Sequence, residues 1–334
     1  MPHARFRPSD HPHETFLLAT VVGSFPQPDW LDRMRELAAE DDSVDLEEAE
    51  ADAVKACIGD QQRAGLDVVT DGEMRRTGMV EHFAQFVHGY DQDGGGSGWN
   101  ARMPTVTDTV SSDVPWLVED FEFADAVADR PVKTTITGPF TLASFASLEA
   151  YDDVEQLAYD FADLVAAEAG RLAAAGAQWI QIDEPALGMS PHGAIAHECL
   201  TRIDAAVPEE VRLGVHVCSG NYQNLIPDLF EFPVDEVDLE FASDGADDPA
   251  AVFEGRTLEF DIGFGVVNTQ AKAVDTVDEI RANIESALDH VPAERLTLTP
   301  DCGMKPLPRE AAYGKIENLA TAVREVEAAL DEVG

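Results

Sequence analysis

Four residues in the second half of the chain carry side chains that bind metal ions: His216, Cys218, Glu240 and Cys302. His216 and Cys218 are two apart in RLGVHVC (212–218), so on a β-strand their side chains point to the same face. Glu240 and Cys302 each end a later apolar run. Two thiolates, an imidazole and a carboxylate suit tetrahedral Zn²⁺. The four residue types predict a zinc site, although a His-x-Cys pair alone is also common in protein cores.

The elements that must position these ligands are short apolar or β-branched runs, each bounded by Gly, Pro or acidic turn residues. We predict eight strands, at 17–25, 67–73, 132–139, 179–185, 212–218, 236–241, 259–267 and 295–303. We predict helices between them or after the last, at 46–64, 154–175, 277–290 and 308–333. Strands that alternate with helices imply parallel βαβ units. Eight such units predict a (β/α)₈ TIM barrel, with a doubly wound open sheet as the alternative.

The barrel prediction treats the whole chain, residues 1–334, as a single catalytic domain. Residues 1–14 are interpreted as a flexible tail. Residues 87–131, which include the run DQDGGGSG, do not fit the repeat and predict an insertion between the second and third strands. On the catalytic face of a barrel, this insertion would cover the substrate or would be a hairpin without function. The four ligand residues would converge at the carboxyl ends of strands five, six and eight.

The charge of the chain is strongly unbalanced. It has 65 acidic and 22 basic residues, a formal net charge of −43. A field of this sign repels nucleic acid and anionic membranes, so neither is expected as a partner. Because the acids are spread over the whole chain, we interpret them as a solvated surface suited to concentrated salt, as in a halophilic protein.

The chain has no apolar run of about 18 residues, as a membrane span would need, and its first residues lack the apolar segment of a secretory signal. A cytoplasmic protein is therefore expected. Its four cysteines are too few for a disulfide scaffold. Cys57 lies within the predicted helix at 46–64 and Cys199 on a helix expected after the fourth strand, so we interpret them as core residues.

Six motifs in the predicted strands resemble the catalytic barrel of cobalamin-independent methionine synthases. They are VVGSFPQ, DGEMRR with MVEHF, TGPFTLASF, QIDEPAL, HVCSGNY and PDCGMK. The resemblance covers roughly residues 17–330 and implies the same zinc site as the residue types. It also implies that homocysteine is the substrate, a thiol that zinc would hold as the nucleophilic thiolate for methyl transfer. The product would be methionine.

The resemblance implies a homocysteine site as well. Ser24 and its neighbours would hold the carboxylate of the substrate, and Glu73 and Asp183 would receive its ammonium group. From residue types alone, these two acids at strand ends would be interpreted as solvated residues of a very acidic protein.

The chain departs from the family pattern in three ways, and the last of them bears on the methyl donor. The long members of the family carry a second, N-terminal barrel, whereas this chain resembles the short archaeal members. Phe145 stands where the family has Trp, and Gln270 stands where it has a His that serves as general acid. Methyltetrahydrofolate needs a proton before its nitrogen can leave and a methyl corrinoid does not, so we place the corrinoid slightly ahead of folate. The alternatives are a zinc-dependent alkyltransferase acting on another thiol, such as coenzyme M, and a zinc protein without catalytic activity.

Overall fold

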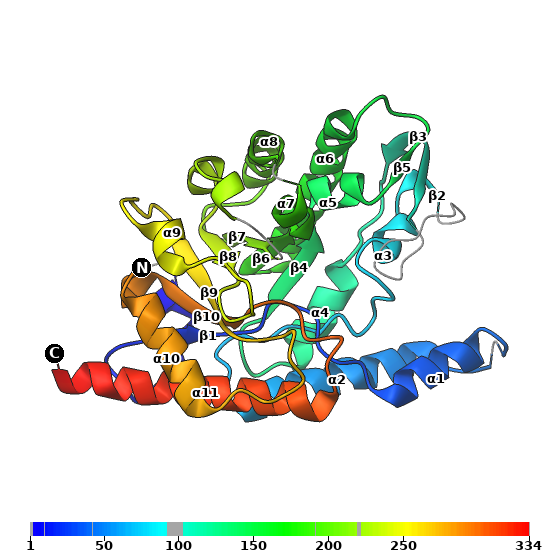
Figure 1. The fold of residues 1–334 in the computed structure, drawn as a ribbon. Helices are drawn as coiled ribbons and strands as arrows, with labels where there is room; N and C mark the ends of the chain where they lie inside the picture. The colour runs from blue at the N-terminus through cyan, green and yellow to red at the C-terminus, as the bar shows by residue number, and fades with distance from the viewer. Residues whose placement is uncertain are drawn as a thin grey trace.

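A curled parallel sheet forms the centre of the computed structural model, which describes residues 3–9, 11–41, 43–91, 103–190, 192–218 and 222–333 (Figure 1). The strand order is β1-β10-β9-β8-β7-β6-β4, and all neighbours run parallel. These strands are β1 (Leu18–Ala19), β4 (Lys133–Thr137), β6 (Trp179–Asp183), β7 (Arg212–Val217), β8 (Glu236–Leu239), β9 (Asp261–Val267) and β10 (Leu296–Pro300). The fold is therefore of the α/β class, as predicted, and seven of the eight predicted strands belong to this sheet.

The remaining predicted strand, residues 67–73, forms a single parallel bridge between Val69 and Val132. The amide of Asp67 donates to the carbonyl of Ala19 at 3.0 Å, and the amide of Lys133 donates to the carbonyl of Val69 at 2.8 Å. This segment thus bonds to both edges of the curled sheet. It cannot extend further as a strand, because Gly72 and Glu73 adopt left-handed backbone angles, with φ of 66° and 58°.

Helices follow most of the strands and cover the outer face of the sheet (Figure 1). They are α1 (Asp29–Ala38), α2 (Leu46–Ala64), α3 (Glu81–Ala84), α4 (Val118–Val127), α5 (Pro139–Ser144), α6 (Val154–Ala175), α7 (Pro185–Met189), α8 (Gly193–Asp204), α9 (Pro249–Phe253), α10 (Val277–Leu288) and α11 (Arg309–Val333). Short 3₁₀ helices are η1 (His3–Phe6), η2 (Tyr222–Asn224), η3 (Asp228–Glu231) and η4 (Ala293–Arg295). In the described ranges, no helix combines the length and apolar character that crossing a membrane requires.

The sequence predicts the long helices well because their ends carry local signals. In α2, the side chain of Asp45 accepts a hydrogen bond from the amide of Glu48, and Gly65 ends the helix with a φ of 96°. In α6, Asp153 caps the start of the helix and Gly176 ends it in the same way. Both helices have the predicted bounds, whereas α10 ends two residues earlier and α11 begins one residue later than predicted.

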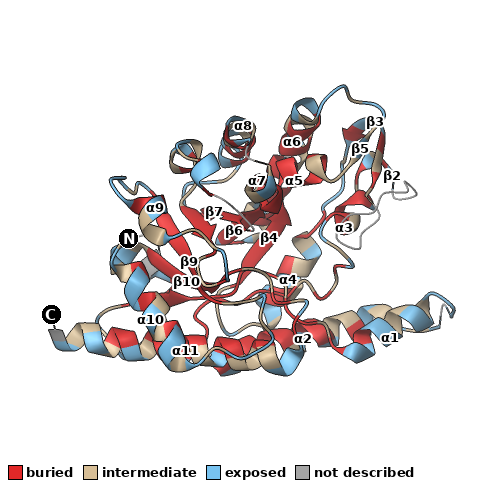
Figure 2. Cartoon of the chain, in the orientation of Figure 1, coloured by how far each residue is buried: buried red, intermediate tan, exposed pale blue. Residues whose placement is uncertain are grey.

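The strands of the sheet are buried (Figure 2), and many of the buried side chains on its inner face are polar. Arg212 on β7 donates hydrogen bonds to Glu236 on β8 at 2.6 Å and to Asp261 on β9 at 2.8 Å. A side chain can reach a strand two places away only because the sheet curls around it. Alternate residues such as Val215 face outward and pack in the apolar core under the helices.

A second, three-stranded sheet lies beside α5 and α6 (Figure 1). It contains β2 (His88–Asp91), β3 (Thr105–Ser111) and β5 (Ser147–Leu148), with β2 antiparallel and β5 parallel to β3. Most of it comes from the predicted insertion at 87–131, of which residues 92–102 lie outside the described residues. The hydroxyl of Tyr90 donates to the carbonyl of Leu142 at 2.8 Å and so joins this sheet to α5. That the insertion covers a substrate stays a prediction.

The described residues of the first 14, interpreted above as a flexible tail, pack against the base of the main sheet. The ring of Phe6 is buried and lies 5.2 Å from the ring of Trp179. His11 lies 3.2 Å from Glu327 of α11. An apolar contact and a buried polar contact therefore hold this segment, which its polar composition does not indicate.

Candidate metal centre and substrate pocket

His216, Cys218 and Cys302 meet at the carboxyl ends of β7 and β10. Their ligand atoms all lie within 4.8 Å of one another. The two sulfur atoms are 3.5 Å apart and form no disulfide. With Zn–S bonds of about 2.3 Å at tetrahedral angles, two sulfurs would lie about 3.8 Å apart. The group, called the metal centre below, therefore has the donor atoms and the spacing for one ion of this size.

The imidazole of His216 is held in one orientation. Its Nδ1 donates to Oδ2 of Asp238 at 2.8 Å, since a carboxylate can only accept, and Oδ1 of Asp238 accepts from the hydroxyl of Thr299 at 2.8 Å. The other ring nitrogen, Nε2, is buried and has no hydrogen-bond partner among the residues that the structure describes. A His whose Nδ1–H is bound to a carboxylate and whose Nε2 is unpartnered matches the usual arrangement of a metal ligand.

Protons would compete with a metal ion for these side chains. Burial disfavours a charge on His216, but the carboxylate of Asp238 and the sulfur of Cys302 raise the pKa of His216 well above its ordinary value. The hydrogen bond with Cys218 lowers the pKa of Cys302 well below its ordinary value, against burial and with help from His216. Cys302 is therefore the preferred thiolate, and a metal ion would displace the proton that His216 carries.

Glu240, the fourth predicted ligand, is buried one residue beyond β8. Its amide donates to the hydroxyl of Tyr222 at 2.9 Å, and this hydroxyl donates to the carbonyl of Val217 at 3.0 Å. Burial and then the charge of Glu240 raise the pKa of Tyr222 well above its ordinary value, so the carboxylate lies nearby. Glu240 is not in the group whose ligand atoms lie within 4.8 Å of one another. Its place as a ligand stays a prediction.

Asp301 joins the loops that carry Glu240 and Cys302. Its Oδ1 accepts from the amides of Phe241 at 3.0 Å and Ala242 at 2.9 Å. Asp301 precedes Cys302, and the two amides follow Glu240. The carboxylate therefore fixes two of the predicted ligands relative to each other.

Glu73 lies on a turn whose backbone is under strain, because a φ of 58° is rare for a residue with a Cβ. The carbonyl oxygens of the turn are held from outside it. The side-chain amide of Gln27 donates to the carbonyl of Glu73 at 3.3 Å and to the carbonyl of Arg76 at 3.0 Å. Nζ of Lys305 also donates to the carbonyl of Arg76, at 3.1 Å. The carboxylate of Glu73 accepts from the hydroxyl of Thr135 at 3.2 Å. Loops far apart in the sequence thus fix this side chain.

Asp183 ends β6 and lies directly beside His216 in the register of the sheet. Its Oδ1 accepts from the side-chain amide of Gln181 at 2.7 Å. Burial raises the pKa of Asp183 to about 7; the charge of Glu73 acts in the same direction, and that of His216 opposes it. Glu73 and Asp183, called the carboxylate pair below, therefore lie close enough for their charges to interact.

Ser24, the third predicted substrate residue, is half-buried and lies against the residue that follows Cys302. Its carbonyl accepts from the amide of Met304 at 2.8 Å. A Cβ placed on Gly303 would come within 2.2 Å of the Ser24 hydroxyl, so a side chain at this position would force the hydroxyl to move. Ser24 is thereby close to the metal centre.

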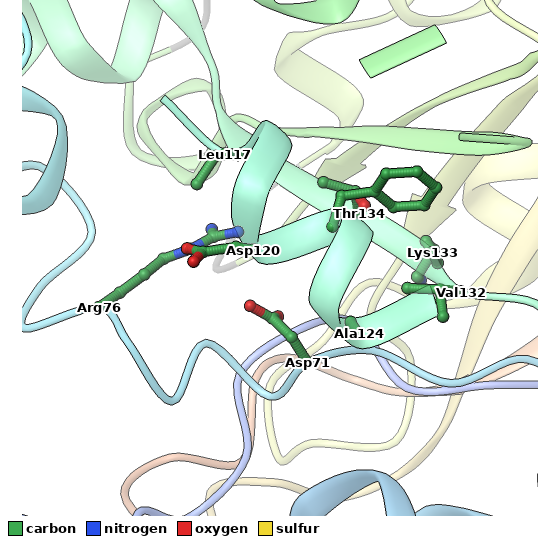
Figure 3. Close-up of a pocket in the computed structure, with 9 residues that line it drawn as sticks. Asp71, Arg76, Leu117, Asp120, Ala124, Val132, Lys133 and Thr134 are labelled. Atoms are coloured by element: carbon green, nitrogen blue, oxygen red, sulfur yellow. The ribbon is translucent and has the colours of Figure 1, made fainter. Parts of the chain in front are cut away.

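Arg76 extends beneath the turn that carries Glu73 and lines a small cavity with Asp71 and Asp120 (Figure 3). The cavity has room for about one water molecule. The guanidinium donates to the carbonyl of Thr135 at 2.8 Å and lies 3.8 Å from Glu73. Burial opposes its charge, but the charge of Glu73 and other acids raise the pKa of Arg76. A buried cation therefore stays charged beside the carboxylate pair.

Two residues depart from the family pattern. Gln270 is exposed after β9, and its backbone amide donates to the side-chain oxygen of Asn268 at 2.8 Å. Phe145 is half-buried at the end of α5. The two remaining cysteines, Cys57 and Cys199, are buried, as predicted for core residues.

Residue types did not indicate Asp238, Gln181 or Lys133, all of which are buried near the site. Asp238 and Gln181 each stand two positions before a predicted site residue, Glu240 and Asp183, on the same face of the strand. This alternation along the strands could have identified Asp238 and Gln181 from the sequence. It shows which residues lie below the site, but it does not show which atoms they contact.

Comparison of this chain with known sequences and structures assigns it to a family. The family described as "Cobalamin-independent synthase, Catalytic domain" matches residues 17–325. The chain is 35% identical over 325 residues to the methionine synthase of Sulfurisphaera tokodaii, and 35% identical over 326 residues to that of Pyrococcus abyssi; 95% of each chain is covered in both cases. It is 25% identical, with a TM-score of 0.84, to a B12-independent methionine synthase from Shewanella sp. W3-18-1 in complex with selenomethionine, covering 94% of this chain and 98% of that one. The chain therefore belongs to the cobalamin-independent synthase family.

Proposed function

We propose that this protein is a methyltransferase that forms methionine by transfer of a methyl group to the thiol of homocysteine. Membership in the family supports the reaction, and so do relatives named methionine synthase that match along almost the whole chain. The observation that carries the chemistry is the buried Nε2 of His216, which has no hydrogen-bond partner among the described residues and lies beside the sulfurs of Cys218 and Cys302. Such a group binds a soft or borderline metal ion.

We further propose that the metal is zinc and that Glu240 is its fourth ligand with His216, Cys218 and Cys302. Two sulfurs, a nitrogen and an oxygen suit a tetrahedral site, and the ligand spacing agrees with Zn–S bonds of about 2.3 Å. When bound, zinc would supply a positive charge that keeps a substrate thiol deprotonated. Asp238 orients His216 toward the metal, and Asp301 keeps the loops of Glu240 and Cys302 in position.

The substrate carries an ammonium group and a carboxylate, and we assign a residue type to each. The carboxylate pair, Glu73 and Asp183, would bind the ammonium, because a half-buried and a buried acid provide charge-assisted acceptors. Ser24 would donate to the carboxylate. Arg76 stays charged under the pair, which limits the repulsion between the two acids before the substrate arrives.

For the methyl donor, we propose a methyl corrinoid or corrinoid protein ahead of methyltetrahydrofolate. The leaving nitrogen of the folate must be protonated, and an amide such as that of Gln270 is not an acid. A corrinoid leaves without a proton. Restoring an acid by Gln270→His would separate the two donors: activity gained with folate alone supports the proposal, and equal folate activity in both proteins contradicts it.

We also propose that the segment at 67–73 completes a (β/α)₈ barrel and that residues 1–334 act as one catalytic domain. The hydrogen bonds of this segment to both sheet edges support closure. The three-stranded sheet, joined to α5 by Tyr90, supports a place for the insertion near the catalytic face.

The proposed reaction is tested directly by an assay for methionine. Zinc-loaded protein in concentrated salt is incubated with homocysteine and each donor, and methionine is measured. Methionine is the expected product. Equal alkylation of mercaptoethanesulfonate, which lacks an amino group, would instead indicate a transferase for another thiol. Unchanged metal coordination when a thiol is added would indicate a zinc protein without catalytic activity.

A further inference from the structure

A row of three buried polar side chains runs up the inner face of the sheet from its base to the carboxylate pair. Nζ of Lys133 on β4 donates to Oε1 of Gln181 on β6 at 2.6 Å. Nε2 of Gln181 donates to Oδ1 of Asp183 at 2.7 Å and to the carbonyl of Val22 at 3.0 Å. All three side chains are almost completely buried. We call this row the Lys133–Gln181–Asp183 chain.

Lys133 determines the direction of every hydrogen bond in the chain. An amide side chain can be turned so that either its oxygen or its nitrogen faces a given neighbour. An ammonium group can only donate, so the oxygen of Gln181 must face Lys133. The NH₂ group must then face Asp183, where it favours the ionised carboxylate. The carbonyl of Val22, which can only accept, agrees with this orientation.

The chain leaves the two oxygens of Asp183 in different situations. Oδ1 accepts from Gln181, whereas no residue in the described ranges donates to Oδ2. We propose that Lys133 and Gln181 are positioning residues that hold Asp183 with Oδ2 open to the substrate ammonium, so that the enzyme selects thiols carrying an α-amino group. This inference rests on the proposed homocysteine site and adds to it the residues that set its specificity.

The burial of Lys133 is otherwise hard to explain. A buried ammonium group is costly unless charges and hydrogen bonds surround it. Lys133 lies 5.1 Å from the centre of the Trp179 ring, and the acids Asp238, Glu236 and Asp183 raise its pKa while burial, the larger effect, lowers it. These neighbours favour the charged form of Lys133 against its burial. An apolar residue at this position would pack without that cost, so a role in orienting Gln181 accounts for the lysine.

Thiol binding to the zinc-loaded protein tests the proposal. Homocysteine is compared with 4-mercaptobutanoate, the same thiol without its amino group. Gln181→Met, which has a similar shape and no donor, should weaken homocysteine binding about 10-fold and change 4-mercaptobutanoate binding less than about twofold. Lys133→Met should give a smaller loss of the same kind, because the oxygen of Gln181 is then no longer held, while its NH₂ group still has Val22 and Asp183 as acceptors. Lys133→Arg, which still donates to Gln181, should restore most of the preference.

Two controls separate this effect from a loss of folding. Zinc content and thermal unfolding are measured for each variant, and Lys133→Met carries the test if Gln181→Met does not fold. Lys315→Met removes another fully buried lysine, which bonds to the carbonyl of Asn268 at 2.8 Å, and should lower stability without changing the preference. Equal losses for both thiols, or an unchanged preference, would overturn the inference. Failure of the wild-type protein to prefer homocysteine would overturn the proposed substrate instead.

Discussion

The metal centre and the carboxylate pair lie at the same end of the sheet, but the chain builds them differently. His216 and Cys218 share one face of a single strand, and a neighbouring carboxylate, Asp238, orients the imidazole. Glu73 depends on a left-handed backbone, and Asp183 depends on a buried row of polar side chains. The candidate metal centre can thus be encoded by residue type and spacing, whereas the proposed binding of an ammonium group would depend on contacts between residues that are distant in the sequence.

The largest effect should follow from removing both sulfurs of the metal centre. Zinc binding by the Cys218→Ser, Cys302→Ser double variant should fall at least roughly 10³-fold, because two of the strongest ligands are lost. Metal analysis and X-ray absorption of the wild type should show about one zinc with two sulfur ligands. Cys199→Ala, which removes a buried cysteine from α8, should keep its zinc. If the double variant bound zinc as well as the wild type does, Cys218 and Cys302 would not be the zinc ligands.

Smaller effects should follow from neutralising the carboxylate pair. Glu73→Gln and Asp183→Asn should each weaken homocysteine binding about 10- to 150-fold, the value of a lost charge-assisted hydrogen bond, roughly 1.5–3 kcal/mol. Zinc content should not change, which would separate the two regions experimentally. Calorimetric titration with homocysteine and with 4-mercaptobutanoate measures the effect. If both thiols lose equal affinity, the two acids support the fold and do not bind the ammonium.

A third prediction concerns how far the metal centre depends on its neighbour Asp238. Asp238→Asn should lower zinc affinity about 10- to 100-fold, because a neutral amide orients His216 less well and makes it a weaker ligand. Competition with a chelator measures this affinity. Glu236→Gln is the matched control, since this buried acid stands on the same strand but contacts Arg212. Equal weakening in both variants would mean that general loss of stability, and not the orientation of His216, is the cause.

The fold could be predicted largely from the sequence because its signals are local. Apolar runs indicated seven strands of the sheet, and the predicted bounds of α2 and α6 agree with their capping residues, such as Asp45 and Gly176. The segment at 67–73 was predicted as a strand, but the turn at Gly72 and Glu73 limits it to one bridge. The packing of Phe6 on Trp179 was missed, because a single aromatic residue in a polar segment gives no periodic signal.

The candidate site could be predicted only in part. The residue types of His216, Cys218 and Cys302 indicated a ligand group, and in the structure their ligand atoms lie within 4.8 Å of one another. The substrate residues came from a resemblance, since two acids in so acidic a chain carry no distinctive signal. Lys133 and Gln181 could not have been found this way: they lie on separate strands, and their hydrogen bond depends on how the sheet curls.

The smallest effect, a dependence on pH, tests whether the two regions act independently on one substrate. The pKa of Asp183 is raised to about 7. The ammonium group needs the ionised carboxylate, so below this pH homocysteine must first displace a proton from Asp183. Its affinity should therefore fall about 10-fold between pH 8 and pH 6, and it should level off above pH 8, where the carboxylate is already ionised. The binding of any thiol to a metal also weakens with falling pH, since its own proton must leave. For this reason the measured quantity is the ratio of the affinities for homocysteine and 4-mercaptobutanoate at each pH, in which the contribution of the thiol cancels. In the Asp183→Asn variant, which has no proton to exchange, this ratio should be low and independent of pH. A ratio that is constant with pH in the wild type would show that the amino group is recognised without Asp183.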